Sequence, residues 1–269
     1  MQTVAIAGLG AIGKELARRL TTQGGIPGLS LVAASARDEP KARAFLDGIG
    51  AGAVAIAPLG RLGALADIVV EVLPSAAFDE LAEPTLRAGR TLVVVSVGAL
   101  LDRPGLRGLA ERHGGKIVVP TGALLGLDAV RAAAEGDIRS VKMITRKPPG
   151  GLKGAPHLEK NRISVDGLTA PLKVFAGTAR EAVRGFPANV NVAAALSLAG
   201  IGPDRTTIEI WADPGVDRNR HRIEVDADSA WFALEIANVP SENPKTGRIT
   251  ALSVVALLRR LGSSFQIGT

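Results

Sequence analysis

Residues 3–13 read TVAIAGLGAIG, an apolar run that leads directly into the pattern G-x-G-x-x-G. The run predicts a buried β-strand, residues 14–21 have the apolar spacing of a helix, and residues 30–35 predict a second strand. In such a unit the first glycine permits a tight turn, the second lets a diphosphate approach the backbone, and the third lets the helix pack on the strand. This order of elements therefore favours a dinucleotide-binding site, and the alternative is an ordinary glycine turn.

The predicted cofactor is NAD or NADP. Backbone amides of the turn and the helix N-terminus are expected to bind its phosphates, which makes the cofactor contacts there Gly8, Gly10, Ala11, Ile12 and Gly13. A second strand that prefers NAD usually ends in Asp or Glu, which bonds the ribose hydroxyls. Here Ser35 ends the strand and can bond a ribose or phosphate oxygen, while Arg37 can pair with the 2′-phosphate of NADP. The alternative for Arg37 is a solvated position in the loop.

Further apolar runs predict strands, with helices between them, at residues 53–57, 68–71, 91–97 and 116–119. Because these runs are continuous, we expect a parallel sheet with helices on both faces, that is, a doubly wound Rossmann domain in an α/β protein. After residue 120 the pattern predicts a second, α+β domain for catalysis and oligomerisation. The C-terminal segment has helical spacing and is expected to pack back on the first domain. The predicted domains are 1–120 with about 240–269, and 121–239.

Composition excludes several kinds of site. The chain has 269 residues, of which 46% are hydrophobic and 22% charged, as in an ordinary globular protein. It has no cysteine, which excludes disulfides, thiolate metal sites and a cysteine nucleophile. Its histidines, His113, His157 and His221, are widely separated and lack the paired helical spacing of a histidine metal site. No metal is therefore expected.

The charge pattern indicates small anionic ligands. The net charge of +6 is scattered along the chain, and aromatic residues make up only 3%, so a nucleic-acid partner is not expected. A basic protein attracts anions such as a dinucleotide or a carboxylate. No apolar stretch approaches the roughly 20 residues that cross a bilayer, and no secretion signal is visible. We therefore expect no membrane span and a cytoplasmic location.

In the second domain, His221 is the candidate for proton transfer, because the imidazole pKa lies near neutrality and suits the group to activate water. Strand alternation places Asn219, His221 and Ile223 on one face, and Arg220 and Arg222 on the other. The alternative for His221 is an exposed strand residue. The pattern predicts an antiparallel hairpin followed by a third strand, at residues 206–212, 221–225 and 231–236.

Several segments resemble the L-aspartate dehydrogenase family. They run nearly end to end in the family's order, and FPANVNV, which begins at residue 186, is far more specific than a glycine motif. The resemblance implies NAD(P)-dependent oxidation of L-aspartate to iminoaspartate, which water converts to oxaloacetate and ammonia, and a supply of iminoaspartate for NAD biosynthesis. The segments are GLGAIG (8–13), SVGA (96–99), GALLGLD (122–128), FPANVNVA (186–193), NRH (219–221) and NPKT (243–246).

The same resemblance implies roles for single residues. His221 matches the family's catalytic histidine, and Ala123 and Asn189 match positions that contact the dinucleotide. A dicarboxylate also needs cations to bind it. The candidates for that role are three residues of a predicted loop at 146–156 and one residue before the last helix, namely Arg146, Lys147, Lys153 and Lys245.

Two other interpretations of the sequence stay open. One is an oxidoreductase like dihydrodipicolinate reductase or homoserine dehydrogenase, although the chain lacks the histidine pair of the former. The other is a sensor that binds NAD(P) without catalysis. A homodimer is the expected assembly, because most soluble oligomers have two-fold symmetry.

Overall fold

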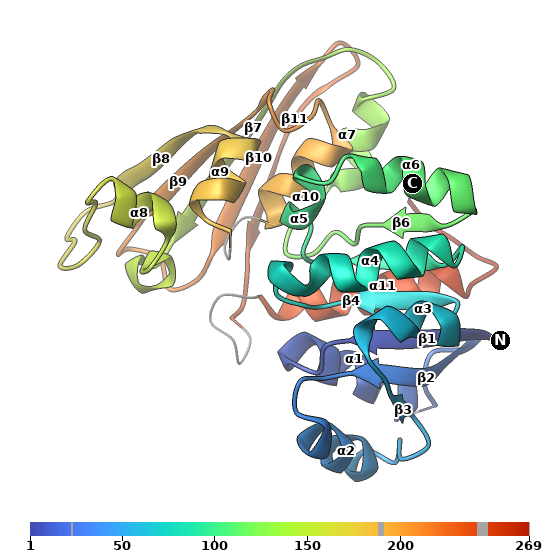
Figure 1. The fold of residues 1–269 in the computed structure, drawn as a ribbon. Helices are drawn as coiled ribbons and strands as arrows, with labels where there is room; N and C mark the ends of the chain where they lie inside the picture. Colours follow the sequence, from blue (N-terminus) through green and yellow to red (C-terminus); the bar gives the residue numbers. More distant parts are fainter. Residues whose placement is uncertain (23, 188–190, 241–246, 269) are drawn as a thin grey trace. The chain divides into compact units, whose positions relative to one another are not determined.

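The computed structural model describes residues 1–22, 24–187, 191–240 and 247–268 (Figure 1). The Cα positions divide the chain into two compact units. Unit 1 consists of Met1–Pro120 and Ala251–Ile267, and unit 2 contains Thr121–Thr250. Among the described residues, no helix is both long and apolar enough to cross a membrane.

Unit 1 is built on a six-stranded parallel sheet with the order β3-β2-β1-β4-β5-β6. Because β1 has β2 on one side and β4 on the other, the strand order reverses beside β1. Ligands of open α/β sheets bind at such a point, beyond the carboxyl ends of the strands. The strands are β1 (Gln2–Ala7), β2 (Leu29–Ser35), β3 (Ala55–Ile56), β4 (Ile68–Glu71), β5 (Thr91–Val94) and β6 (Lys116–Val118).

Helices cover both faces of this sheet, as predicted for a doubly wound domain (Figure 1). Alternate side chains of β1 point to the two faces of the sheet. Val4 and Ile6 belong to one buried cluster, and Ala5 and Ala7 belong to the other. The elements between the strands are α1 (Ala11–Thr21), α2 (Glu39–Gly48), η1 (Leu59–Arg61), α3 (Leu62–Leu65), η2 (Ser75–Ala77), α4 (Phe78–Arg87), α5 (Gly98–Leu101) and α6 (Gly105–His113).

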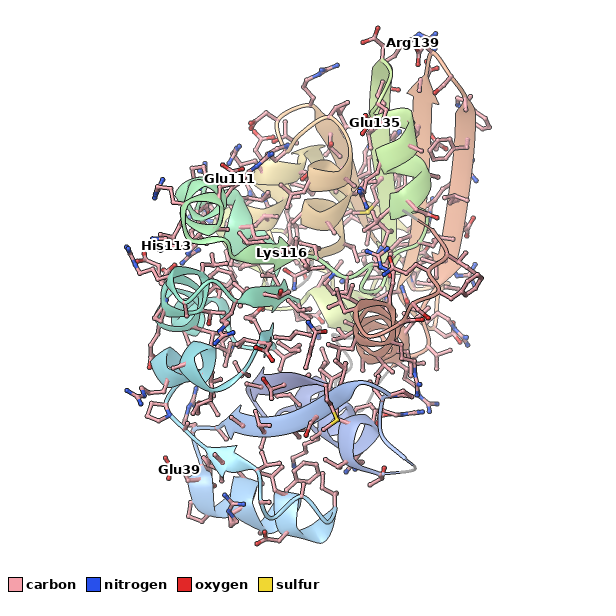
Figure 2. All side chains as sticks on the ribbon, turned by 90° about the vertical axis from the view of Figure 1, so that its right-hand side faces the viewer. Glu39, Glu111, His113, Lys116, Glu135 and Arg139 are labelled. Carbon is pink, nitrogen blue, oxygen red and sulfur yellow. The ribbon has the colours of Figure 1, made fainter. Side chains whose placement is uncertain are left out.

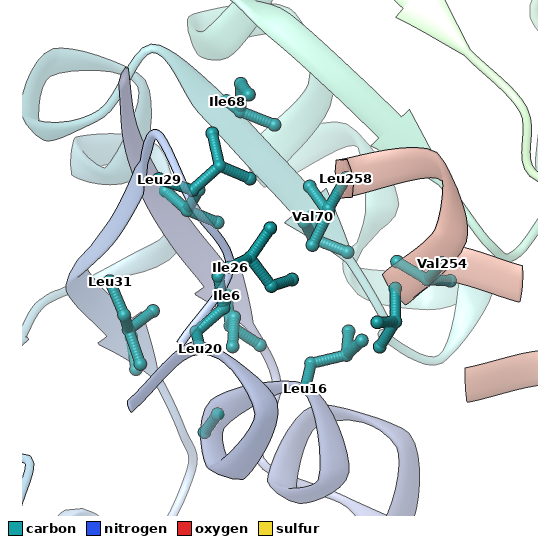
Figure 3. Packing of buried hydrophobic residues seen from close by; sticks show 14 of the residues in the cluster. Ile6, Leu16, Leu20, Ile26, Leu29, Leu31, Ile68, Val70, Val254 and Leu258 are labelled. Atoms are coloured by element: carbon teal, nitrogen blue, oxygen red, sulfur yellow. The ribbon is translucent and has the colours of Figure 1, made fainter. Parts of the chain in front are cut away.

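The C-terminal helix α11 (Arg248–Leu261) completes the core of unit 1. Figure 3 shows Val254 and Leu258 of this helix packed with Ile6 and Val70 of the sheet and Leu16 of α1. Val254 and Leu258 are fully buried. The prediction that the tail packs on the first domain is therefore confirmed.

Unit 2 is built on a five-stranded mixed sheet with the order β11-β10-β7-β9-β8. Helices α9 and α10 contact β9 on the face that carries the buried side chains. The strands are β7 (Ile138–Lys147), β8 (Leu172–Thr178), β9 (Thr206–Ala212), β10 (Arg220–Ala227) and β11 (Trp231–Ala237). The helices are α7 (Leu127–Ala133), η3 (Pro149–Leu152), α8 (Pro156–Lys160), α9 (Ala179–Gly185) and α10 (Asn191–Ala199).

The predicted hairpin between β9 and β10 is wrong. These strands are neighbours in sequence, but β7 lies between them, parallel to β9 and antiparallel to β10. The loop after β9 crosses the end of β7, where Asp213 N donates to the Lys147 carbonyl at 2.8 Å. Asp213 also accepts from Arg146 Nη1 at 2.9 Å, which fixes the crossing. The predicted pairing of the third strand is confirmed, because β10 and β11 form an antiparallel pair.

Two strand ends also differ from the prediction. The strand predicted at 91–97 ends at Val94, where the next two amides, of Val95 and Ser96, bond the Glu71 carboxylate. Strand β7 continues to Lys147, two residues into the loop predicted at 146–156, because Arg146 pairs with Arg220 and Trp211 in the two neighbouring strands. Lys147 is therefore a strand residue and not part of the predicted loop.

Candidate active site

The glycine turn of unit 1 has the close contacts that only glycine permits. Gly8 follows β1 with φ +104°, and a Cβ there would lie 2.8 Å from the Val72 carbonyl oxygen. A Cβ on Gly13 would lie 1.9 Å from the Gly8 carbonyl oxygen, which is far inside contact distance. Gly10 differs, since a Cβ on this residue would meet no atom within 4 Å, which leaves its backbone open to a ligand. This division of roles is the one expected for a dinucleotide turn.

Helix α1 presents its N-terminus beyond this turn. Gly10 is its N-cap and no side chain caps it, and its first turn, which contains Ala11, Ile12 and Gly13, holds no acidic residue. The amides and the helix dipole therefore favour a phosphate there. The turn and the helix start together fit the diphosphate of NAD or NADP.

The end of β2 lies beside the turn. The Ser35 carbonyl accepts from Gly8 N at 2.9 Å, and the residue is buried. Arg37 is exposed and makes no ion pair within the described part of the chain. The nearest acidic residue, Asp38, accepts from Lys41 N at 3.0 Å as the N-cap of α2. The carboxylate after β2 thus stabilises a helix start, whereas the guanidinium of Arg37 faces solvent.

Glu71 was not predicted as a site residue, but it fixes the loops that follow β4 and β5, next to the point where the strand order reverses. Its Oε1 accepts from Leu73 N at 2.6 Å, and its Oε2 accepts from Val95 N at 3.1 Å and Ser96 N at 2.8 Å. The side chain is fully buried, and burial raises the pKa of its carboxyl while the N–H donors of Ser96 and Leu73 act in the opposite direction. A charged residue at the end of the apolar run IVVE was the available sequence signal.

In unit 2, β7 and β10 bring Thr145 and His221 face to face. The two residues are register partners, and Thr145 Oγ1 lies 3.0 Å from His221 Nδ1. Both side chains are buried, at 1% and 3% exposure. The predicted alternation along β10 is correct, since His221 and Ile223 are buried and Arg220 is exposed. The imidazole is therefore held at one nitrogen by a hydroxyl group on the neighbouring strand.

The imidazole of His221 is held in its neutral form. Burial, together with the nearby charge of Lys147, lowers its pKa from 6.5 to about 3. A neutral imidazole can accept a proton. For Nε2 to accept it, Nδ1 must carry the hydrogen and donate it to Thr145 Oγ1, which is the orienting role that a hydroxyl at this position can fill.

Lys147 lies on the same face of β7 as Thr145, two residues further along. It is 2% exposed, and its side chain is therefore buried, as is that of His221. The other proposed carboxylate ligands lie elsewhere. Arg146 bonds Asp213 and stacks over the Trp211 ring at 4.9 Å on the opposite face, and the exposed Lys153 pairs with Asp166. Lys245 lies outside the described residues.

The turn that contains Ala123 is fixed by Asn238. The Asn238 side-chain amide donates to the Ala123 carbonyl at 3.0 Å, and Asn238 N donates to the Asn219 carbonyl at 2.8 Å. Asn238 therefore links this turn to the start of β10, two residues before His221. The other residue that matched a dinucleotide contact, Asn189, lies outside the described residues.

The two remaining histidines have structural surroundings. His113 ends α6 and is exposed, and Figure 2 shows it at the outer edge of unit 1. His157 lies in α8 and packs against Phe175 and Phe186 at 5.2 and 5.3 Å between ring centroids. Within the described ranges, no group of three or more His, Asp or Glu residues is arranged to hold a metal ion.

Comparison with known proteins assigns the family. Residues 128–261 match the family model described as aspartate dehydrogenase, C-terminal, and residues 8–120 match homoserine dehydrogenase, NAD binding domain. An L-aspartate dehydrogenase of Bradyrhizobium diazoefficiens is 58% identical over 99% of this chain and 94% of its own length. The chain belongs to the aspartate dehydrogenase family. The resemblance seen in the sequence is confirmed, and the homoserine dehydrogenase description covers only the NAD-binding part.

Other members of the aspartate dehydrogenase family support the same assignment. L-aspartate dehydrogenase 3 of Bordetella bronchiseptica is 56% identical over 99% of this chain and 97% of its own length. The crystal structure of aspartate dehydrogenase from Thermotoga maritima is 25% identical, covers 100% of both chains and superposes with a TM-score of 0.75. The fold class predicted from the sequence, a Rossmann domain with a second sheet domain, is therefore confirmed. The chain is an oxidoreductase that uses NAD(P).

Proposed function

We propose that this protein is an L-aspartate dehydrogenase that uses NAD or NADP. The observation that carries the proposal is the neutral, buried imidazole of His221, oriented by Thr145 next to Lys147, in a member of the aspartate dehydrogenase family. In the reaction a hydride leaves Cα, the nitrogen lone pair forms the C=N bond, and a proton is released. The products of this step are iminoaspartate and the reduced cofactor.

NAD or NADP, when bound, supplies the chemistry of accepting the hydride. The residues proposed to hold it are those of the glycine turn and the end of β2, together with Ala123 and Asn189. The first group consists of Gly8, Gly10, Ala11, Ile12, Gly13, Ser35 and Arg37. Arg37 is proposed to pair with the 2′-phosphate of NADP, because it is exposed while Asp38 is engaged as a helix cap.

His221 is proposed to catalyse the hydrolysis of iminoaspartate. Its Nε2 takes a proton from water as the water oxygen adds to the imine carbon, which gives a carbinolamine. The nitrogen of this adduct takes the proton back from the imidazole. The hydroxyl group of the carbinolamine then gives its own proton to the same nitrogen as the C–N bond breaks and the C=O bond forms, which releases ammonia and oxaloacetate. Unit 2 is thus proposed as the catalytic and oligomerisation domain, and unit 1 as the dinucleotide-binding domain.

The cellular setting is also a proposal. We propose that the enzyme works in the cytoplasm as a homodimer, for which two-fold symmetry is the general precedent. We further propose that part of its iminoaspartate supplies NAD biosynthesis. Sedimentation of the purified protein tests the dimer directly, because a monomeric species at all concentrations would contradict it.

Absorbance at 340 nm tests the proposed reaction. Purified protein with L-aspartate and NAD or NADP is expected to produce reduced cofactor, whereas D-aspartate, L-glutamate and L-homoserine serve as controls. Formation of oxaloacetate and ammonia in equal amounts is expected at the end of the reaction. Cofactor binding without reduction by L-aspartate would reject the proposal in favour of a different substrate or an NAD(P) sensor.

A further inference from the structure

Lys147 is a buried lysine on the same side of the unit 2 sheet as His221. Lys147 is 2% exposed and lies at the end of β7, two residues beyond Thr145 on the same face. Thr145 is the register partner of His221, so Lys147 lies two residues along β7 from the position opposite the imidazole. Two groups that are both able to carry positive charge thus lie together inside unit 2.

We propose that Lys147 binds a carboxylate of the substrate next to His221. This inference deepens the proposed function and rests on it, because it assigns the residue that recognises the dicarboxylate. Lysine acts as a compact point charge with three donors, which suits a carboxylate group. The substrate carboxylate would place an anion beside Lys147 and the reacting carbon within reach of the imidazole.

The surrounding cations support the choice of Lys147. Arg222 bonds Glu224 at 2.8 Å within β10, on the face opposite to His221. Arg146 is held by Asp213 and Trp211, again on the opposite face. Among the described cations of the central strands β7 and β10, Lys147 is therefore the one whose side chain shares the buried face with His221.

The position of the Lys147 backbone is fixed by β9 and the residue that follows it. Its carbonyl accepts from Asp213 N at 2.8 Å, and the residue pairs with Ala212 of β9 in the sheet. A rigid strand end of this kind holds a charged group more accurately than a loop, which favours discrimination between substrates by charge and length. The residue is expected to act on substrate recognition and not on cofactor binding.

Two variants and one matched control test the inference. Lys147→Met keeps the length and removes the charge, and Lys147→Arg keeps the charge. The control is Lys142→Met on the same strand but on the opposite face, where Lys142 pairs with Glu209 at 2.9 Å. In Lys147→Met, kcat/KM for L-aspartate is expected to fall roughly 10²-fold or more, mainly through KM, with an unchanged Kd for NAD(P). Lys147→Arg should recover part of the loss, and Lys142→Met should behave as the wild type.

A binding measurement separates this inference from the proposed function. Succinate, a dicarboxylate that cannot be oxidised at an amine, is titrated into protein whose histidines are labelled with nitrogen-15. We expect succinate to shift the His221 resonance in the wild type and in Lys142→Met, but not in Lys147→Met.

The outcomes are distinct. An active wild type with an equally active Lys147→Met variant would overturn the inference and leave the proposed function standing. An inactive wild type whose His221 resonance responds to succinate through Lys147 would reject the proposed function and retain the dicarboxylate site. A wild type that neither oxidises L-aspartate nor binds succinate would overturn both.

Discussion

Thr145 and His221 are 76 residues apart in the sequence, yet Thr145 Oγ1 lies 3.0 Å from His221 Nδ1 in the interior of unit 2. The two residues face each other because β7 and β10 pair in antiparallel register. The hydroxyl therefore selects the imidazole orientation, and with it the nitrogen that is left to exchange a proton.

Thr145→Val tests that orienting role. The substitution keeps the shape of the side chain and removes the hydroxyl, so kcat for L-aspartate is expected to fall roughly 10-fold or more with little change in KM for the cofactor. Steady-state kinetics provide the measurement. Thr207→Val is the control, because Thr207 lies exposed on β9. An unchanged kcat in Thr145→Val would show that the hydroxyl does not orient the imidazole.

His221→Ala tests the proposed catalyst. Removal of the imidazole should lower kcat roughly 10²-fold or more, while the Kd of NAD(P), measured by fluorescence, stays near the wild-type value. His113→Ala, at the exposed end of α6, is the matched control and should be fully active. Near-normal turnover in His221→Ala would remove this residue from the mechanism.

The lowered pKa of His221 predicts a specific loss of stability in acid. Between pH 6.5 and about 3 the unfolded chain binds a proton at this residue that the folded protein does not bind. The free energy of unfolding should therefore fall as the pH is lowered through this window, by about 1.4 kcal/mol per pH unit from this group. Urea unfolding at several pH values should show a shallower pH dependence for His221→Gln than for the wild type. Equal slopes would mean that the histidine is not held neutral.

Arg37 is predicted to set the use of NADP. Arg37→Ala removes the proposed partner of the 2′-phosphate, so kcat/KM with NADP should fall roughly 10-fold or more while the value with NAD hardly changes. Lys41→Ala, a nearby exposed substitution on α2, serves as the control. A variant that loses activity equally with both cofactors would indicate a structural role for Arg37 instead.

Glu71 is predicted to maintain the shape of the dinucleotide site. Glu71→Gln replaces one carboxylate oxygen with an NH2 group, which cannot accept a hydrogen bond from the backbone N–H groups. An unsatisfied buried group costs about 1–3 kcal/mol. We expect weaker binding of both NAD and NADP, measured by calorimetry, together with a lower urea midpoint. Glu83→Gln on the exposed face of α4 is the control. Wild-type affinity and stability in Glu71→Gln would show that the three hydrogen bonds from backbone N–H groups to the Glu71 carboxylate are dispensable.

The parts of the fold that follow from local sequence were predictable. The βαβ unit, the strand Ile68–Glu71 and the alternation around His221 each depend on neighbouring residues, and each is present as expected. The inserted position of β7 was not predictable, because it depends on pairing between segments far apart in the chain. The same limit explains the site: His221 was identified, but Thr145 joins it only through that pairing.

Glu71 and Lys147 show a second limit. Glu71 ends the apolar run IVVE, and Lys147 follows Arg146 at the start of a segment rich in proline and glycine. Sequence patterns predict a boundary between a strand and a solvated loop at such charged residues. The structure buries both, since Glu71 receives three backbone N–H groups and Lys147 continues the buried face of β7. Only the three-dimensional surroundings distinguish a buried charged residue from an exposed one at a strand end.

The packing of α11 has a consequence for how the protein is made. Its residues Val254 and Leu258 fill the core beside Ile6 and Val70, so the dinucleotide-binding unit requires both ends of the chain. Domains generally fold as units during translation, with the N-terminal one first. Here the first 120 residues must leave the ribosome with part of one sheet face uncovered until the last helix has been made. Folding of the first unit is thereby completed only after synthesis of the second.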